Sequence, residues 1–138
     1  MPKNTSRECI LDCACLLFIA TFLIFYQLGG KSLTTWDELI YAQASKEMLV
    51  HHQWLTLLDQ GKPMFDKPPL YMWFTALFYS LFGISEFTTR LTSALAGTGS
   101  ILLTYLIARR CFSRMEGWIS ALLLLSSVHF YNYARLTL

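Results

Sequence analysis

Two pairs of charged side chains are the groups in this sequence best suited to chemistry. Asp37 and Glu38 are adjacent, and further along the chain Asp66 and Lys67 stand directly before two prolines. A carboxylate can take a proton from an attacking hydroxyl, and an ammonium group can hold a phosphate. Both pairs lie between long apolar stretches, so the combination suits a substrate that has a phosphate and a lipid tail.

Each of these groups also has a purely structural explanation. Carboxylates in the first turn of a helix favour the positive end of its dipole, and Thr35 with Glu38 fits a capping box. Asp66 can cap a helix whose first turn the prolines set. Lys67 can snorkel from an apolar segment towards water. Ionisable groups at a membrane are functional candidates by default, so the structural and the functional interpretation both stand.

The composition indicates a membrane protein. The 138 residues are 54% hydrophobic and 14% charged, whereas soluble domains carry about 25% charged residues. The net charge of +2 is too small to indicate nucleic acid, and we expect no such partner. The four cysteines do not form a disulfide framework and are interpreted as small apolar residues of helices.

Three apolar stretches predict membrane-spanning helices, over residues 10–30, 86–108 and 115–134. Each is close to the roughly 20 residues that a helix needs to cross a bilayer, although Asp12 interrupts the first. That stretch is long for a signal peptide, and no small-residue cleavage site follows it. The positive-inside rule then places residues 1–9 and the basic loop 109–114 in the cytoplasm.

Residues 31–85 are expected to form an outer loop with helices at the membrane interface, at about 36–51 and 68–82. The second helix is too short to span, and if it did span, the basic loop would lie outside. A turn is predicted at residues 60–63. Residues 135–138 would begin the next outer loop, and we expect the chain to be the N-terminal part of a longer protein.

Several motifs occur in one order along the chain. They are Trp-Asp-Glu-x-x-Tyr-Ala at 36–42, Phe-Asp-Lys-Pro-Pro-Leu-Tyr-x-Trp at 65–73, Leu-Phe-Gly-x-Ser-Glu-Phe-x-x-Arg-Leu at 81–91 and Tyr-Ala-Arg at 133–135, with Glu47-Met48 and Ala-Arg-Arg at 108–110. In this order they resemble the N-terminal part of bacterial GT-C membrane glycosyltransferases. The relatives are the dolichyl-phosphate-mannose–protein mannosyltransferase-like family and the aminoarabinose transferases that modify lipid A.

The resemblance implies an all-α integral membrane fold, of which this chain would hold about three transmembrane helices and the interfacial helices. It implies an enzyme of the bacterial inner membrane that moves a sugar from a polyprenyl-phosphate donor to a lipid, glycan or protein acceptor on the outer face. Asp37 is the implied catalytic base or the partner that orients it, and Lys67 is the residue implied to bind the lipid phosphate. The other implied substrate-binding residues are Asp66, Glu38, Tyr41, Arg90 and Arg135. Some relatives use a divalent metal ion, for which Asp37 and Glu38 would be the ligands here.

Two departures weaken assignment to lipid A. Ile40 stands where aminoarabinose transferases usually carry arginine, and Asp66 stands where they commonly carry glutamate. A non-catalytic protein that binds lipid phosphates is the alternative function. A transporter is disfavoured because the stretches 91–108 and 118–134 carry no charge, and Gly97 and Gly99 are interpreted as helix-packing positions.

Overall fold

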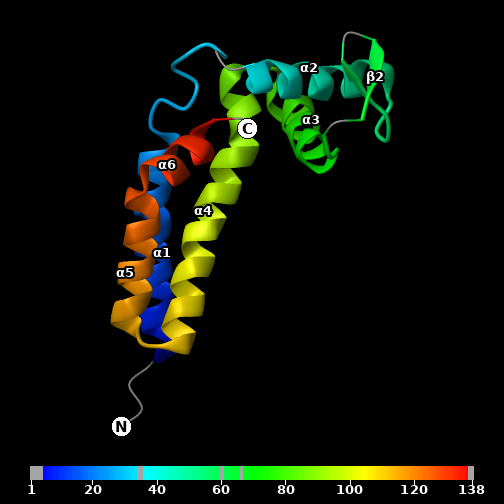
Figure 1. The fold of residues 1–138 in the computed structure, drawn as a ribbon. Coiled ribbons are helices and arrows are strands. Elements are labelled where there is room, and N and C mark those ends of the chain that lie inside the picture. Colours follow the sequence, from blue (N-terminus) through cyan, green and yellow to red (C-terminus); the bar gives the residue numbers. More distant parts are fainter. Residues whose placement is uncertain (1–4, 34–35, 60, 66, 137–138) are drawn as a thin grey trace. The chain divides into compact units, whose positions relative to one another are not determined.

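The computed structural model describes residues 5–33, 36–59, 61–65 and 67–136, which are largely helical (Figure 1). This agrees with the predicted all-α class except for one short hairpin. The elements, in chain order, are α1 (Thr5–Phe25), α2 (Trp36–His51), β1 (Leu57–Asp59), β2 (Lys62–Met64), α3 (Leu70–Phe82), α4 (Glu86–Cys111), α5 (Arg114–Ser126) and α6 (Val128–Arg135).

The chain divides into two compact units. The first contains the residues up to Tyr26 together with Leu95–Ala134, and the second contains Gln27–Ala94 and the residues from Arg135 onward. Helix α4 is continuous and contributes its N-terminal part to the second unit and its C-terminal part to the first.

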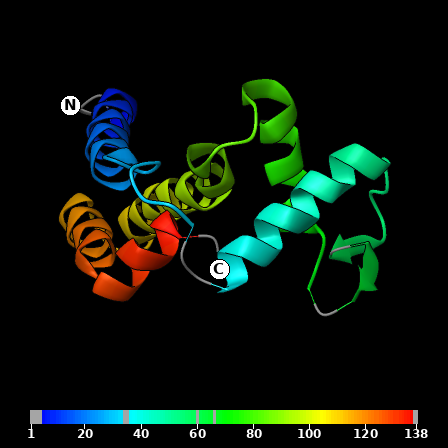
Figure 2. The ribbon, with the colours of Figure 1, turned by 90° about the horizontal axis from the view of Figure 1, so that it is seen from above.

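The first unit is a bundle of α1, the C-terminal part of α4, α5 and α6, with α1 lying beside α4 and α5 (Figures 1 and 2). Leu16, Ala20 and Ile24 recur every four residues along α1, and all three are fully buried. The opposite face of α1 is apolar as well, and Phe18 and Phe22 are 73% and 61% exposed. A helix that is hydrophobic all round suits a membrane, where lipid covers the outer face.

One end of this bundle is held by a buried carboxylate. Asp12 of α1 is 4% exposed. It accepts hydrogen bonds from the Tyr105 hydroxyl at 2.6 Å, from the Arg109 guanidinium at 2.9 Å and from the Arg114 guanidinium at 2.8 and 2.7 Å. A buried charge is tolerated only when it is paired and hydrogen-bonded. The predicted interruption of the first apolar stretch is therefore a link from α1 to α4 and α5.

Two helices of the described residues are long and apolar enough to cross a membrane, Ser6–Phe25 and Glu86–Cys111. The first ends before the predicted residue 30 because Gln27 adopts a positive φ of 53° ahead of two glycines. The second continues past the predicted residue 108 and includes two arginines in its last turn.

The prediction of one continuous helix over residues 115–134 is wrong. The stretch forms α5 and α6, separated at Ser127, whose backbone is extended with φ −66° and ψ 117°. The Ser126 hydroxyl donates to the Leu123 carbonyl at 2.9 Å. Serine side chains compete in this way with the helical hydrogen-bond ladder, and a β-branched valine follows at 128. At 1.5 Å per residue, α5 alone is about 20 Å long, less than the hydrocarbon thickness of a bilayer.

The second unit is built on α2 and α3, which lie side by side (Figure 2). Its core is formed by Tyr41, Ala44, Met48, Leu57, Met72 and Ala76. Helix α2 covers the residues expected for the first interfacial helix. Helix α3 begins at Leu70 rather than 68, because Lys67 and Pro68 each precede a proline and such residues disfavour helical backbone.

Of the turn predicted at 60–63, Gly61 lies in a turn, whereas Lys62 and Pro63 belong to the second of two short strands that were not predicted. β1 and β2 pair antiparallel with Leu57 opposite Met64 and Asp59 opposite Lys62. Gly61 has a φ of +75°, the left-handed region that glycine adopts readily. Strands of three residues are too short to show the alternating pattern by which a strand is detected. The hairpin packs against α2 through the buried side chain of Leu57.

Candidate functional site

Three residues predicted to be functional lie together in the second unit: Asp37, Tyr41 and Lys67, here called the acid–lysine cluster. The Lys67 Nζ is 3.2 Å from Asp37 Oδ1 and 5.4 Å from the centre of the Tyr41 ring. Asp37 and Tyr41 are one helical turn apart and share a face of α2. The side chains of Lys67 and Asp37 are 33% and 42% exposed, so both remain accessible to a ligand.

The start of α3 fixes the backbone next to Lys67. Pro69 precedes the helix with φ −75° and ψ −15°, and its carbonyl accepts from the Trp73 amide at 3.0 Å. Tyr71 packs edge-on against the Tyr41 ring with centroids 5.1 Å apart. Its hydroxyl donates to the Thr89 carbonyl at 3.1 Å. Tyr71 thus fastens the first turn of α3 to both α2 and α4. Lys67 lies three residues before the start of α3 at Leu70.

The electrostatics favour a charged ammonium group. The hydrogen bond to Asp37, followed by the charge interaction with Tyr41, raises the pKa of Lys67 above its usual value. Solvent-exposed ion pairs contribute little to stability, so a ligand can replace Asp37 as the partner of Lys67 at small cost. The cluster therefore offers a cation for an anionic ligand and, beside it, a carboxylate that can accept a proton.

Glu38 is oriented differently from its neighbour, because successive residues of a helix are about 100° apart. Its side chain is fully buried and accepts two hydrogen bonds from Arg90, from Nε at 2.8 Å and from Nη2 at 3.1 Å. Arg90 also donates to three backbone carbonyls, those of Leu28, Lys31 and Ser32, at 3.0, 2.7 and 3.3 Å. Both residues were expected to bind substrate. That role stays a prediction, and in the structure the pair fastens the start of α2 and the segment before it to α4.

The ion pair between Glu38 and Arg90 also affects whether Asp37 and Glu38 could bind a metal ion, as was expected. Both Glu38 oxygens accept from Arg90, so a metal at this motif would have to displace a buried guanidinium. Within the described ranges, no group of three or more His, Cys, Asp or Glu residues could hold a metal ion. The described residues of the motif therefore do not fit a divalent metal.

The two other predicted substrate-binding residues stay predictions. Asp66 lies outside the described residues. Arg135 is the last residue of α6 and is half-buried.

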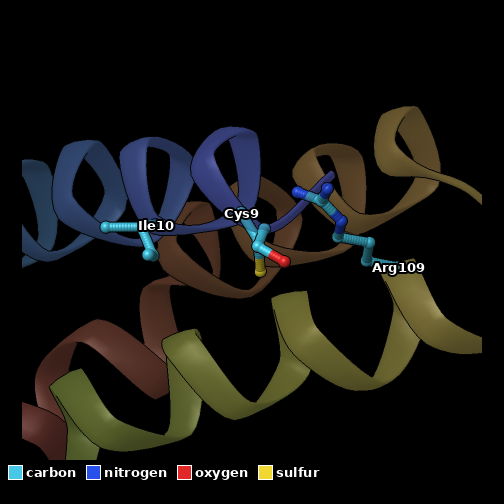
Figure 3. Close-up of a pocket in the computed structure, with 4 residues that line it drawn as sticks. Cys9, Ile10 and Arg109 are labelled. Atoms are coloured by element: carbon cyan, nitrogen blue, oxygen red, sulfur yellow. The ribbon is translucent and has the colours of Figure 1, made fainter. Parts of the chain in front are cut away.

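Two surface hollows are lined by other residues. One, of about 290 Å³, lies on the face of α2 opposite Asp37 and is lined by Leu39, Ala42 and Lys46 together with residues of α3 and α4. The other, of about 480 Å³, belongs to the first unit, and Figure 3 shows Cys9 and Ile10 of α1 and Arg109 of α4 on its walls. The acid–lysine cluster itself lines neither of these hollows.

Two buried carboxylates were not predicted to have partners, Asp12 and Glu47. Glu47 belongs to a motif of the sequence but had no role assigned to it. A carboxylate within an apolar stretch must be paired when it is buried, so the sequence held a signal that partners exist. The sequence did not indicate which residues are the partners of these two carboxylates.

Comparison with known proteins identifies the family. The family model described as dolichyl-phosphate-mannose-protein mannosyltransferase matches residues 66–138, just over half of the chain. The chain belongs to this family of GT-C glycosyltransferases. The resemblance drawn from the motifs is thereby confirmed.

Individual relatives in the family are similar over most of this chain. An undecaprenyl phosphate-alpha-4-amino-4-deoxy-L-arabinose arabinosyl transferase of Pseudomonas savastanoi pv. phaseolicola is 39% identical over 113 residues, which are 80% of this chain and 21% of that protein. An uncharacterised protein of Aquifex aeolicus is 36% identical over 121 residues, 87% of this chain and 24% of that protein. The chain thus spans about a quarter or less of these relatives' length.

The fold is also similar to that of solved structures. Crystal structures of ArnT from Cupriavidus metallidurans, in the apo state and bound to undecaprenyl phosphate, each superpose with a TM-score of 0.84 at 31% sequence identity. The match covers 90% of this chain and 23% of the ArnT chain.

Proposed function

We propose that this protein acts as a glycosyltransferase that moves a sugar from a polyprenyl-phosphate donor to a lipid, glycan or protein acceptor on the outer face of the bacterial inner membrane. Family membership, the arabinosyl transferase relatives and the similarity to a structure bound to undecaprenyl phosphate support the donor class. The observation that carries the proposal is the 3.2 Å contact between Lys67 and Asp37, in which an ammonium group and a carboxylate lie side by side and both are partly exposed.

In the proposed mechanism Lys67 binds the phosphate of the donor. An arriving phosphate oxygen takes the place of Asp37 as the partner of Lys67, and this releases the carboxylate. Asp37 then accepts the proton of the acceptor hydroxyl while the bond from the acceptor oxygen to the sugar's anomeric carbon forms. The bond from that carbon to the phosphate oxygen breaks, and the polyprenyl phosphate leaves with its charge stabilised by Lys67. Asp66 and Arg135 are proposed to complete the donor site.

Tyr41, Glu38 and Arg90 are proposed to support this site without taking part in the reaction. Tyr41 presents its ring to the Lys67 ammonium, a cation–π contact that restricts where the lysine can lie. The Glu38–Arg90 pair holds the first turn of α2, which bears Asp37, against α4.

Sugar transfer by the full-length protein in detergent, with polyprenyl-phosphate sugars as donors, tests the roles. Asp37→Asn should retain donor binding and lose turnover, because the amide cannot take the proton. Lys67→Ala should weaken donor binding about 10- to 100-fold, the range expected for a charge-assisted hydrogen bond. Lys62→Ala is the matched control, since Lys62 is an exposed lysine of the hairpin, and both quantities should be unchanged.

Two outcomes would contradict the proposal. Unchanged binding and turnover in both variants would mean that these charges only cap and anchor helices. Donor binding that depends on Lys67, without turnover in the wild type, would instead support the non-catalytic lipid-phosphate-binding role.

A further inference from the structure

A second buried carboxylate of α2 contacts the hairpin that leads to Lys67. Glu47 is 7% exposed. Its Oε2 accepts from the Gly61 backbone amide at 3.2 Å, and its Oε1 accepts from Gln43 Nε2 at 2.7 Å. A carboxylate loses much of its hydration on burial, so hydrogen bonds of this kind hold it and its partners in one arrangement. Glu47 thus fastens the hairpin turn to the C-terminal half of α2.

The segment from Gly61 to Lys67, here called the strap, is anchored to α2 at both ends. Glu47 holds it at Gly61, and Asp37 holds it at Lys67. Residues 37 and 47 are about 15 Å apart along the helix axis. Six residues of chain reach about 20 Å when fully extended. The position of the Gly61 end therefore limits how far from it Lys67 can lie.

Apolar packing supports the same arrangement. Met64, in the middle of the strap, packs against the core of the second unit and lies opposite the buried Leu57 in the hairpin. That core includes Tyr41, one helical turn after Asp37, and Met48, which directly follows Glu47. Among the described residues of the strap, Met64 is partly buried, whereas Lys62, Pro63 and Phe65 are exposed.

We propose that Glu47 is a positioning residue of the donor site, which sets the place of Lys67 through the strap. Glu47 touches neither Lys67 nor the reacting atoms. This inference rests on the proposed role of Lys67 as the residue that binds the donor phosphate. Without the Gly61 anchor, Lys67 samples a wider range of positions, and forming the phosphate contact costs more conformational entropy. Asp37 is unaffected, because its position depends on α2 itself.

Steady-state kinetics of the full-length protein separate this role from a general loss of stability. Glu47→Ala should raise the KM for the polyprenyl-phosphate sugar about 3- to 10-fold, the range for one lost hydrogen bond, with kcat within about twofold of wild type. Glu47→Gln should restore most of the affinity, because its amide oxygen can still accept from Gly61. Ser45→Ala is the matched control, since Ser45 is fully buried in the same helix and donates to the Tyr41 carbonyl instead of to the strap.

Hydrogen exchange of the Gly61 amide, measured without donor, tests the anchor independently of activity. Exchange should be faster in Glu47→Ala than in wild type, Glu47→Gln or Ser45→Ala. Unchanged exchange, or an unchanged KM with a lowered kcat, would overturn the inference. If Lys67→Ala leaves donor binding intact while Glu47→Ala still accelerates exchange, the anchor exists but the proposed role of Lys67 fails, and the positioning role falls with it.

Discussion

The buried pair of Glu38 and Arg90 allows a sharp prediction about stability. Glu38→Leu removes the counter-charge and the two hydrogen bonds between Glu38 and Arg90, and it leaves the Arg90 guanidinium buried, with its side chain 5% exposed. Breaking a buried ion pair by removing one partner typically costs about 3–5 kcal/mol. We expect the free energy of unfolding to fall by that amount. Arg90→Met should cost a similar amount, because it removes the charged partner of the buried Glu38 carboxylate.

The double replacement Glu38→Leu with Arg90→Met should cost less than either single change. Apolar residues of similar volume often replace a buried ion pair at no net cost. The remaining penalty comes from the carbonyls that lose their donor, chiefly that of Leu28, which is buried. At about 1–3 kcal/mol for a stranded buried acceptor, the double variant should lose about 1–3 kcal/mol.

Chemical denaturation of the full-length protein in detergent measures these differences. Glu86→Ala is the matched control, since this exposed acid in the first turn of α4 should change stability by less than about 1 kcal/mol. The cycle of single and double variants should give a coupling energy of at least about 2 kcal/mol. If the two single costs simply add, Glu38 and Arg90 do not stabilise each other and the positioning role assigned to them is refuted.

Two further predictions concern one helix contact and one charge. A β-carbon at Gly97 would lie 2.6 Å from the β-carbon of Ala134, whereas a β-carbon at Gly99 would meet nothing within 4 Å. Gly97→Ala should therefore lower the free energy of unfolding by about 1–3 kcal/mol. Gly99→Ala should raise it by up to about 1 kcal/mol, and thermal unfolding measures both changes. Equal effects of the two substitutions would contradict the contact. The pKa of Lys67 is raised above its unfolded value of about 10.4, so the stabilisation from the lysine's charge is fully present below that pH and is lost as the pH rises through the higher folded value. Binding of the donor's phosphodiester should accordingly be flat from pH 7 to 9 in titration calorimetry, and a midpoint inside that window would contradict the assignment.

The sequence by itself determined most of the local structure. The bounds of α2 and the presence of two long apolar helices follow from composition, length and capping, which act between residues close in the chain. The motifs were sufficient to recognise the family, because they depend only on order and spacing. The break at Ser127 was missed, since an uncharged apolar stretch has the same composition whether it forms one helix or two.

Only the tertiary structure decided which charges meet. Asp37 and Glu38 are neighbours in the chain, yet one reaches Lys67 at the surface and the other reaches Arg90 in the interior. A buried charge requires a partner, but many arginines and lysines satisfy that requirement equally well in the sequence. The choice depends on which helices pack together, because an ion pair acts over a few ångströms and the chain brings its members within that distance only when it folds.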